Sequence, residues 1–154
     1  MNKKYLIYII LCFLTFFSYF TLAQSTRNQD LSPVGLWETF DDATGKPLSL
    51  IRIKEHNGEL IAVIVKDLLP AAANDEVCDK CEGNLKNKPI IGMTIMDGMK
   101  QHGDDYEGGY ILDPESGETY RCKLKLDATG NKLEVRGFIG VSLLGRSQTW
   151  TREQ

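Results

Sequence analysis

Most of this chain consists of short segments in which apolar and polar residues alternate, and this alternation limits the folds open to it. In residues 120–126, tyrosine, cysteine and leucine alternate with arginine and lysine. A period of two places each set of side chains on one face of a β-strand, whereas a helix requires a period near 3.6. The chain beyond residue 31 has no amphipathic helical segment of about ten residues or more. The sequence therefore predicts an all-β protein.

Turn signals separate these segments. Residues 42–46 and 127–131 share the sequence Asp-Ala-Thr-Gly, residues 114–117 are a variant of it, and residues 56–59 contain an Asn-Gly pair. An acidic or hydroxyl side chain starts such a turn, and glycine supplies the positive φ that closes it. We interpret the repeated Asp-Ala-Thr-Gly as one turn used twice. Other glycines, at positions 108, 109, 137, 140 and 145, suit bulges and barrel corners.

Eight strands are predicted between the turns, at residues 34–40, 47–55, 59–68, 90–96, 106–112, 118–126, 131–139 and 146–152. Eight consecutive antiparallel strands predict an up-and-down barrel or a two-sheet β-sandwich. The barrel is favoured because closure removes exposed strand edges. We expect a single β-barrel domain over residues 32–154, after a flexible lead at residues 24–31. A barrel of this size has room for side chains or one small ligand.

Residues 1–23 have the three parts of a secretory signal peptide. Lys3 and Lys4 form a positive start, residues 5–20 are almost entirely apolar, and Ala23 offers a small residue at the cleavage point. An apolar run of roughly 16 residues approaches the ~17–25 that span a bilayer, so a retained anchor is the alternative. We expect cleavage, no membrane span afterwards, and an exported protein that is periplasmic or secreted.

The charge of the chain argues against a nucleic-acid partner. The formal net charge is −3, and it becomes −5 when Lys3 and Lys4 leave with the signal peptide. Phosphate binding requires a basic face, which this mild acidity does not predict.

Three cysteines remain after cleavage: Cys78, Cys81 and Cys122. The C-x-x-C spacing of the first two suits a local disulfide, a thioredoxin-like redox centre or part of a zinc site. The redox centre needs a helix start in a βαβ unit, and a zinc site needs four ligands, for which only Cys122, His56 and His102 are further soft donors. The disulfide is favoured because an exported protein lies in an oxidising compartment. We expect no metal and no cofactor.

Two motifs near the ends of the predicted barrel resemble the calycin group, which includes the lipocalins and avidin-like barrels. Gly35-Leu36-Trp37 begins the first predicted strand, and Thr149-Trp150-Thr151-Arg152 ends the last. The resemblance implies that Arg152 lies across Trp37 and closes one end of the barrel. A cation–π contact would stabilise this pairing.

A closer resemblance, over residues 32–152, is to a family of exported bacterial proteins, domain-of-unknown-function family 2147. It implies a small calycin-like barrel and carries over no catalytic residue. The matching segments are residues 33–37, 78–81, 88–92, 108–114, 117–120, 136–140 and 144–150.

Catalytic motifs are missing from the sequence. There is no G-x-S-x-G nucleophile elbow and no glycine-rich phosphate loop. We interpret His56 as an exposed turn residue and His102 as part of a polar loop. The acidic residues between positions 97 and 107 are interpreted as a solubilising loop, because they lack the spacing of a calcium site. We expect that the protein is not an enzyme.

The aromatic residues Trp37, Tyr110, Tyr120 and Trp150 are the candidate ligand-binding residues, with Arg152 at one end. Their rings would line an apolar cavity and offer polar handles to a small, partly apolar molecule or lipid. Cys122 shares the strand face of Tyr120, so we expect a shielded thiol. In the alternative, a filled barrel acts as a structural protein of the cell envelope and contacts a protein partner through its outer surface. A cavity well below ~300 Å³ would contradict ligand binding.

Overall fold

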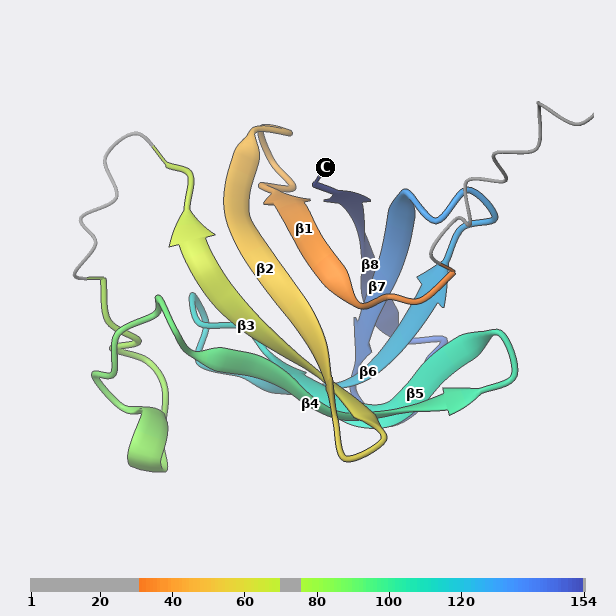
Figure 1. Ribbon diagram of the computed structural model, residues 1–154. Coiled ribbons are helices and arrows are strands. Elements are labelled where there is room, and N and C mark those ends of the chain that lie inside the picture. The colour runs from red at the N-terminus through yellow and green to blue at the C-terminus, as the bar shows by residue number, and fades with distance from the viewer. Residues whose placement is uncertain (1–30, 70–75, 154) are drawn as a thin grey trace, which may run out of the picture.

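The alternating segments form eight antiparallel strands that close into a barrel (Figure 1). The computed structural model describes residues 31–69 and 76–153. Each strand pairs with its neighbours in sequence, and the last strand pairs with the first. The strands are β1 (Gly35–Phe40), β2 (Pro47–His56), β3 (Glu59–Asp67), β4 (Thr94–His102), β5 (Asp105–Leu112), β6 (Thr119–Leu126), β7 (Lys132–Phe138) and β8 (Gly145–Arg152).

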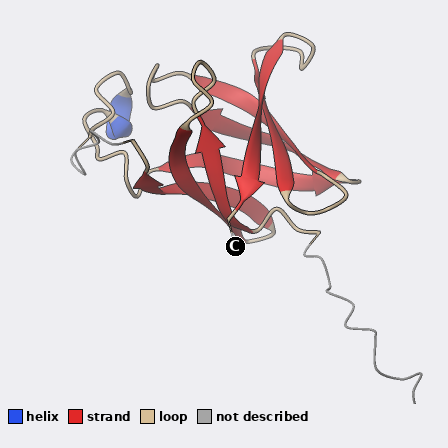
Figure 2. Ribbon diagram, turned by 90° about the horizontal axis from the view of Figure 1, so that it is seen from above, coloured by secondary structure: helices blue, strands red, loops and turns tan. Residues whose placement is uncertain are grey.

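The predicted up-and-down barrel is thus confirmed, and the alternative of a two-sheet sandwich is wrong. A single turn of 3-10 helix, η2 (Gly83–Leu85), lies outside the ring of strands (Figure 2). The described part of the chain has no helix long and apolar enough to cross a membrane. The signal peptide predicted for residues 1–23 and the lead predicted for residues 24–31 lie outside the described residues, except for Leu31.

The core of the barrel consists of the inward-facing half of each alternating segment. On β3, Leu60, Ala62 and Ile64 are buried, whereas Val65 on the opposite face is exposed. On β6 the buried positions are Cys122 and Leu124. Burial of each leucine or isoleucine side chain contributes roughly 1.5–3 kcal/mol to folding, and this gain fixes the strand register.

Strand β4 differs from the prediction, which placed it at residues 90–96. It begins at Thr94 and continues to His102, with Met96 and Met99 buried in the core. Ile90 precedes the strand and packs against the core from the long β3–β4 connection. Asp97 and Gly98 lie between the two methionines, where the register with β3 shifts, and the polar residues that suggested a loop continue the strand to His102. A tight turn at residues 103–104 joins β4 directly to β5.

Trp37 and Arg152 close one end of the barrel, as the resemblance implied. The Trp37 side chain is fully buried, and its Nε1 donates a hydrogen bond to the carbonyl of Pro33. The Arg152 guanidinium carbon lies 4.4 Å from the centroid of the Trp37 ring. The same guanidinium donates hydrogen bonds to three backbone carbonyls, those of Ser32, Val34 and Gly130.

The glycine that precedes Trp37 in this motif has a steric role. Gly35 has a φ of +148°, and a Cβ atom at this position would lie 2.5 Å from Nη1 of Arg152. Any larger residue would therefore displace Nη1 of Arg152, which donates to the Val34 carbonyl.

Candidate ligand cavity

A cavity of about 420 Å³ opens at the end of the barrel opposite the Trp37–Arg152 contact. The connections that follow β1, β3, β5 and β7 surround its mouth. This volume falls in the range of small-molecule sites and exceeds the ~300 Å³ below which ligand binding would be contradicted.

The inner wall of the cavity is apolar. It is lined mainly by inward aliphatic side chains from five different strands, namely Ile51, Ile64, Ile95, Ile111 and Val135. Gly137 on β7 also faces inward, where a Cβ atom would meet Tyr120 and Ile111 at 3.5 and 3.7 Å. Because Gly137 has no side chain, part of the cavity volume lies beside it.

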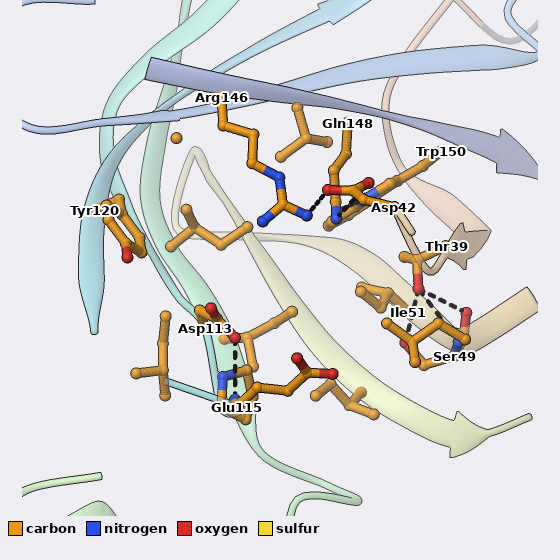
Figure 3. Close-up of a pocket in the computed structure, with 18 of the residues that line it drawn as sticks. Thr39, Asp42, Ser49, Ile51, Asp113, Glu115, Tyr120, Arg146, Gln148 and Trp150 are labelled. Carbon is orange, nitrogen blue, oxygen red and sulfur yellow. Dashed lines mark hydrogen bonds and ion pairs between the residues drawn. The ribbon is translucent and has the colours of Figure 1, made fainter. Parts of the chain in front are cut away.

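A chain of polar contacts follows the inward positions of β8 (Figure 3). Nε1 of the buried Trp150 donates to Oε1 of Gln148 at 3.3 Å, and Nε2 of Gln148 donates to Oδ1 of Asp42 at 3.3 Å. Arg146 forms an ion pair with the same Asp42 carboxylate. The indole, amide and guanidinium groups therefore give an otherwise apolar cavity a polar strip along one wall.

Sequence reasoning selected Trp150 from this strip but missed Asp42, Arg146 and Gln148. The period of two along β8 would have placed positions 146 and 148 on the face of Trp150. The partner carboxylate of Asp42 could not be found in this way, because it depends on how the β1–β2 turn folds.

That turn corrects the interpretation of Asp-Ala-Thr-Gly as one turn used twice. In the β1–β2 turn the carboxylate of Asp41, not Asp42, accepts hydrogen bonds from the backbone and hydroxyl of Thr44. These hydrogen bonds, with that of the Thr44 hydroxyl first, lower the pKa of Asp41. Asp42 is thereby left free to reach Arg146 and Gln148 in the mouth of the cavity.

The β6–β7 turn folds differently around the same four residue types. Asp127 itself accepts the hydrogen bonds there, from the Thr129 hydroxyl and from the backbone of Asn131 and Lys132. The hydroxyl contact is the main cause of the lowered pKa of Asp127. The true counterpart of the β1–β2 turn is the β5–β6 turn, in which Asp113 accepts from Glu115 and Ser116.

Both matching turns lie at the mouth and add carboxylates to it. Among the residues that line the cavity, six are acidic and one, Arg146, is basic. The acidic ones are Asp41, Asp42, Asp67, Glu76, Asp113 and Glu115. The mouth therefore has a negative potential, which disfavours anionic molecules.

The structure divides the five predicted ligand-binding residues among three places. Tyr120 and Trp150 line the cavity. Trp37 and Arg152 form the closed end and do not line the cavity, where Trp37 was expected. Tyr110 does not line it either, because its side chain lies on the outer face and is 56% exposed.

A bulge explains the position of Tyr110. The register between β5 and β6 shifts between Glu107 and Tyr110, at the Gly108-Gly109 pair. An extra residue at a bulge reverses which side chains face inward. Tyr106, before the bulge, packs against the core, whereas Tyr110, after it, points outward.

The predicted disulfide between Cys78 and Cys81 is present, in the connection between β3 and β4. Cys78 Sγ lies 3.3 Å from the carbonyl of Pro114 in the β5–β6 turn. A Cβ atom on Gly117 would lie 2.3 Å from the Lys80 carbonyl, so the disulfide segment packs closely against this turn at the mouth. The disulfide thus orders one side of the cavity entrance.

The third cysteine is shielded as expected. Cys122 is a free thiol with no exposed surface, and burial raises its pKa to about 12. A thiol with this pKa is protonated and unreactive at neutral pH.

The remaining candidate polar residues lie on the β4–β5 hairpin rather than in a flexible loop. Lys123 Nζ forms ion pairs with the carboxylates of Asp105 and Glu107 at 2.7 and 3.8 Å, and Glu107 also contacts His102 Nδ1 at 3.1 Å. Within the described residues, no group of three or more histidine, cysteine or acidic side chains is placed to hold a metal ion.

An eight-stranded up-and-down barrel, sealed at one end and open to an apolar cavity at the other, defines a lipocalin-like protein. A solved structure described as "Protein HP1028 from the human pathogen Helicobacter pylori belongs to the lipocalin family" has the same fold. It matches with a TM-score of 0.70 and 21% sequence identity, over 80% of this chain and 84% of that one.

The family model described as "Uncharacterized protein conserved in bacteria (DUF2147)" matches residues 35–152, and the chain belongs to this family. No curated protein matches the sequence.

Proposed function

We propose that this protein binds one small, predominantly apolar molecule in the cavity and acts by binding rather than by catalysis. The observation that carries the proposal is the 420 Å³ cavity, whose wall is built from inward aliphatic side chains and the ring of Trp150. Lipocalin-like barrels of eight strands are wide enough to hold one small ligand. An export signal predicted at residues 1–23 and the Cys78–Cys81 disulfide support a site of action in the periplasm or outside the cell.

The charges at the mouth favour a neutral or cationic head group on this molecule. Six carboxylates and one arginine line the cavity, and Asp42 already pairs with that arginine, Arg146. An anionic ligand would have to displace Asp42 from Arg146 and would be repelled by the other carboxylates. A hydroxyl or an amine can form hydrogen bonds with these carboxylates without charge repulsion.

The test uses N-phenyl-1-naphthylamine, a neutral probe whose fluorescence rises in apolar surroundings. The substitution Gly137→Leu places an isobutyl group in the cavity, at a position where a Cβ atom makes ordinary contacts. We expect this variant to bind the probe at least tenfold more weakly, because the space is filled.

The matched control is Thr149→Leu, which adds the same side chain at an exposed position on β8. It is expected to bind the probe like the unmodified protein. Equal binding by the Gly137→Leu and Thr149→Leu variants would contradict a ligand site in the cavity.

Competition against the bound probe tests the charge preference separately. Octylamine is expected to displace the probe at a lower concentration than octanoate at pH 7. The reverse order would contradict the electrostatic part of the proposal and leave the cavity site standing.

A further inference from the structure

The connection between β7 and β8, residues 139–144, displays four large apolar side chains to solvent. We call this segment the apolar loop. The exposed fractions of its side chains are 70% for Ile139, 62% for Val141, 85% for Leu143 and 74% for Leu144. Scattered exposed aliphatic residues are common, but a contiguous group of this kind marks a surface that contacts a protein or a membrane.

The apolar loop is held in this conformation by Arg136 on β7. Nε of Arg136 donates to the Ser142 carbonyl at 2.7 Å, and Nη2 donates to the Leu143 carbonyl at 3.3 Å. The remaining nitrogen, Nη1, donates to the Ser147 hydroxyl on β8. These contacts fix the loop backbone against the barrel. Ile139 and Leu144 border the cavity, whereas Val141 and Leu143 do not line it and are exposed to solvent.

Next to the apolar loop, the outer face of the barrel carries a row of two aromatic rings and an arginine between them. Tyr110, Arg121 and Phe138 occupy paired positions on β5, β6 and β7. The Arg121 guanidinium carbon lies 5.8 Å from the centroid of the Phe138 ring. Tyrosine and other aromatic side chains in such positions suit the boundary between lipid headgroups and acyl chains.

The same outer face is basic. Strands β6 and β7 carry five basic residues on this face, namely Arg121, Lys123, Lys125, Lys132 and Arg136, and one acidic residue, Glu134. Asp105 and Glu107 on the neighbouring β5 pair with Lys123, so the face carries five basic residues against three acidic ones. Lys123, Lys125 and Arg136 lie around a small depression that Ser142 of the apolar loop also lines. The positive charge is therefore adjacent to the exposed apolar side chains.

We propose that the apolar loop inserts into the surface of an anionic phospholipid bilayer, with the outer face of β6 and β7 against the headgroups. A convex apolar loop bordered by basic and aromatic side chains combines the two attractions that hold proteins on such surfaces, apolar burial and charge. The acidic side chains lie around the mouth of the cavity, whereas the basic ones lie on the outer face of β6 and β7. A tilted approach brings the basic face to the lipid.

The first experiment measures co-sedimentation with large unilamellar vesicles, either of phosphatidylcholine alone or of phosphatidylcholine and phosphatidylglycerol in equal parts. The protein is purified after export, and its mass is measured to establish that residues 1–23 have been removed. We expect binding to the mixed vesicles, weaker binding to phosphatidylcholine alone, and a decrease in binding at high salt.

The variant Val141→Ser/Leu143→Ser removes two apolar side chains of the loop and is expected to bind mixed vesicles at least tenfold more weakly. Neither residue lines the cavity, so binding of the naphthylamine probe is expected to be unchanged. The control variant Val65→Ser/Leu85→Ser removes two other exposed apolar side chains, at 37% and 39% exposure, and is expected to bind vesicles normally.

A second readout reports the depth of the loop directly. Trp37 and Trp150 are both buried, so the variant Leu143→Trp adds one exposed reporter. We expect its emission to shift to the blue on mixed vesicles and to be quenched by brominated phosphatidylcholine included in them.

Three results would overturn the membrane proposal: no binding to either kind of vesicle, equal binding by the Val141→Ser/Leu143→Ser variant, or no quenching of Trp at position 143. Self-association that this variant abolishes, without any vesicle binding, would instead assign the loop to a contact between two copies of the chain. Because the naphthylamine probe reports on the cavity alone, failure of either proposal is visible independently of the other.

Discussion

Arg152 lies against the ring of Trp37, with its guanidinium carbon 4.4 Å from the ring centroid, and so connects the last strand of the barrel to the first. The two residues are also Cα partners in the β1–β8 ladder. One guanidinium thus combines a cation–π contact with hydrogen bonds to three backbone carbonyls. The sealed end of the barrel depends on this side chain.

Replacement of Arg152 by lysine is expected to lower the free energy of unfolding by about 1–3 kcal/mol. Lysine keeps the charge but cannot donate to three carbonyls in the planar arrangement of a guanidinium. Urea denaturation measures the change. The control is Arg52→Lys at an exposed position on β2. Equal midpoints for the two variants would contradict the role assigned to Arg152.

Replacement of Gly35 by alanine is expected to destabilise the barrel more than the same change at Gly58. Both glycines have positive φ, but only the Cβ at position 35 meets another atom, Arg152 Nη1 at 2.5 Å. Combining Gly35→Ala with Arg152→Ala is expected to cost less than the sum of the two changes, because the clash disappears with the arginine. Additive losses in a double-mutant cycle would rule out this steric explanation.

Burial of the Cys122 thiol is expected to make stability fall at alkaline pH. Its pKa is about 12 in the folded protein, against about 8.5 in an unfolded chain. Between these values the unfolded chain has lost the proton that the folded protein retains, so unfolding becomes more favourable as pH rises. The stabilisation is fully present below about pH 8.5.

Urea midpoints of the unmodified protein and a Cys122→Ala variant, measured at pH 7, 9 and 10, isolate this effect. As pH rises, the urea midpoint of the unmodified protein is expected to fall more than that of the Cys122→Ala variant. In addition, in protein from which residues 1–23 and thus Cys12 have been removed, one thiol is expected to react with a disulfide reagent in urea and none in the folded state. Rapid reaction of the folded protein would contradict the burial of Cys122.

Replacement of Thr44 by alanine is expected to raise the pKa of Asp41 toward its usual value. The Thr44 hydroxyl is the main cause of the lowered pKa, because it donates to the ionised carboxylate. The stabilisation that accompanies a lowered pKa is present above the unfolded value near 3.9 and disappears as pH falls through the folded value.

Carboxyl chemical shifts followed by NMR from pH 2 to pH 6 measure this pKa. The Thr129→Ala variant provides the matched control, because it removes the corresponding hydroxyl from Asp127 in the other turn. It is expected to raise the pKa of Asp127 and leave that of Asp41 unchanged. A shift of both carboxylates in either variant would indicate a global change rather than a local hydrogen bond.

The sequence predicted the barrel because strands such as β3, β6 and β7 alternate buried and less buried residues with a period of two. The resemblance to the calycin group implied the Trp37–Arg152 contact, and the C-x-x-C spacing favoured the Cys78–Cys81 disulfide. Strand β4 was misplaced because the apolar residues before Gly92 resemble a strand more than the methionine-containing segment that forms one.

Prediction of the cavity was limited by two three-dimensional effects. A bulge at Gly108-Gly109 turns the Tyr110 side chain to the outer face. The alternation of residues along one strand does not reveal where such a bulge inserts an extra residue. In the turn after β1, the carboxylate of Asp41 accepts the hydrogen bonds of Thr44, and this leaves Asp42 to pair with Arg146 and Gln148 at the cavity. Residues of the same type, one position apart, therefore have different roles.

The pairing of β1 with β8 has a consequence for the order in which the protein forms. β1 needs two neighbours, and one of them is the last strand to be synthesised. Until β8 is available, the outer edge of β1 and the edge of the growing sheet both present unpaired backbone groups, which other chains can pair with. The barrel therefore closes late in biogenesis, and the incomplete chain is the form most in need of protection from aggregation.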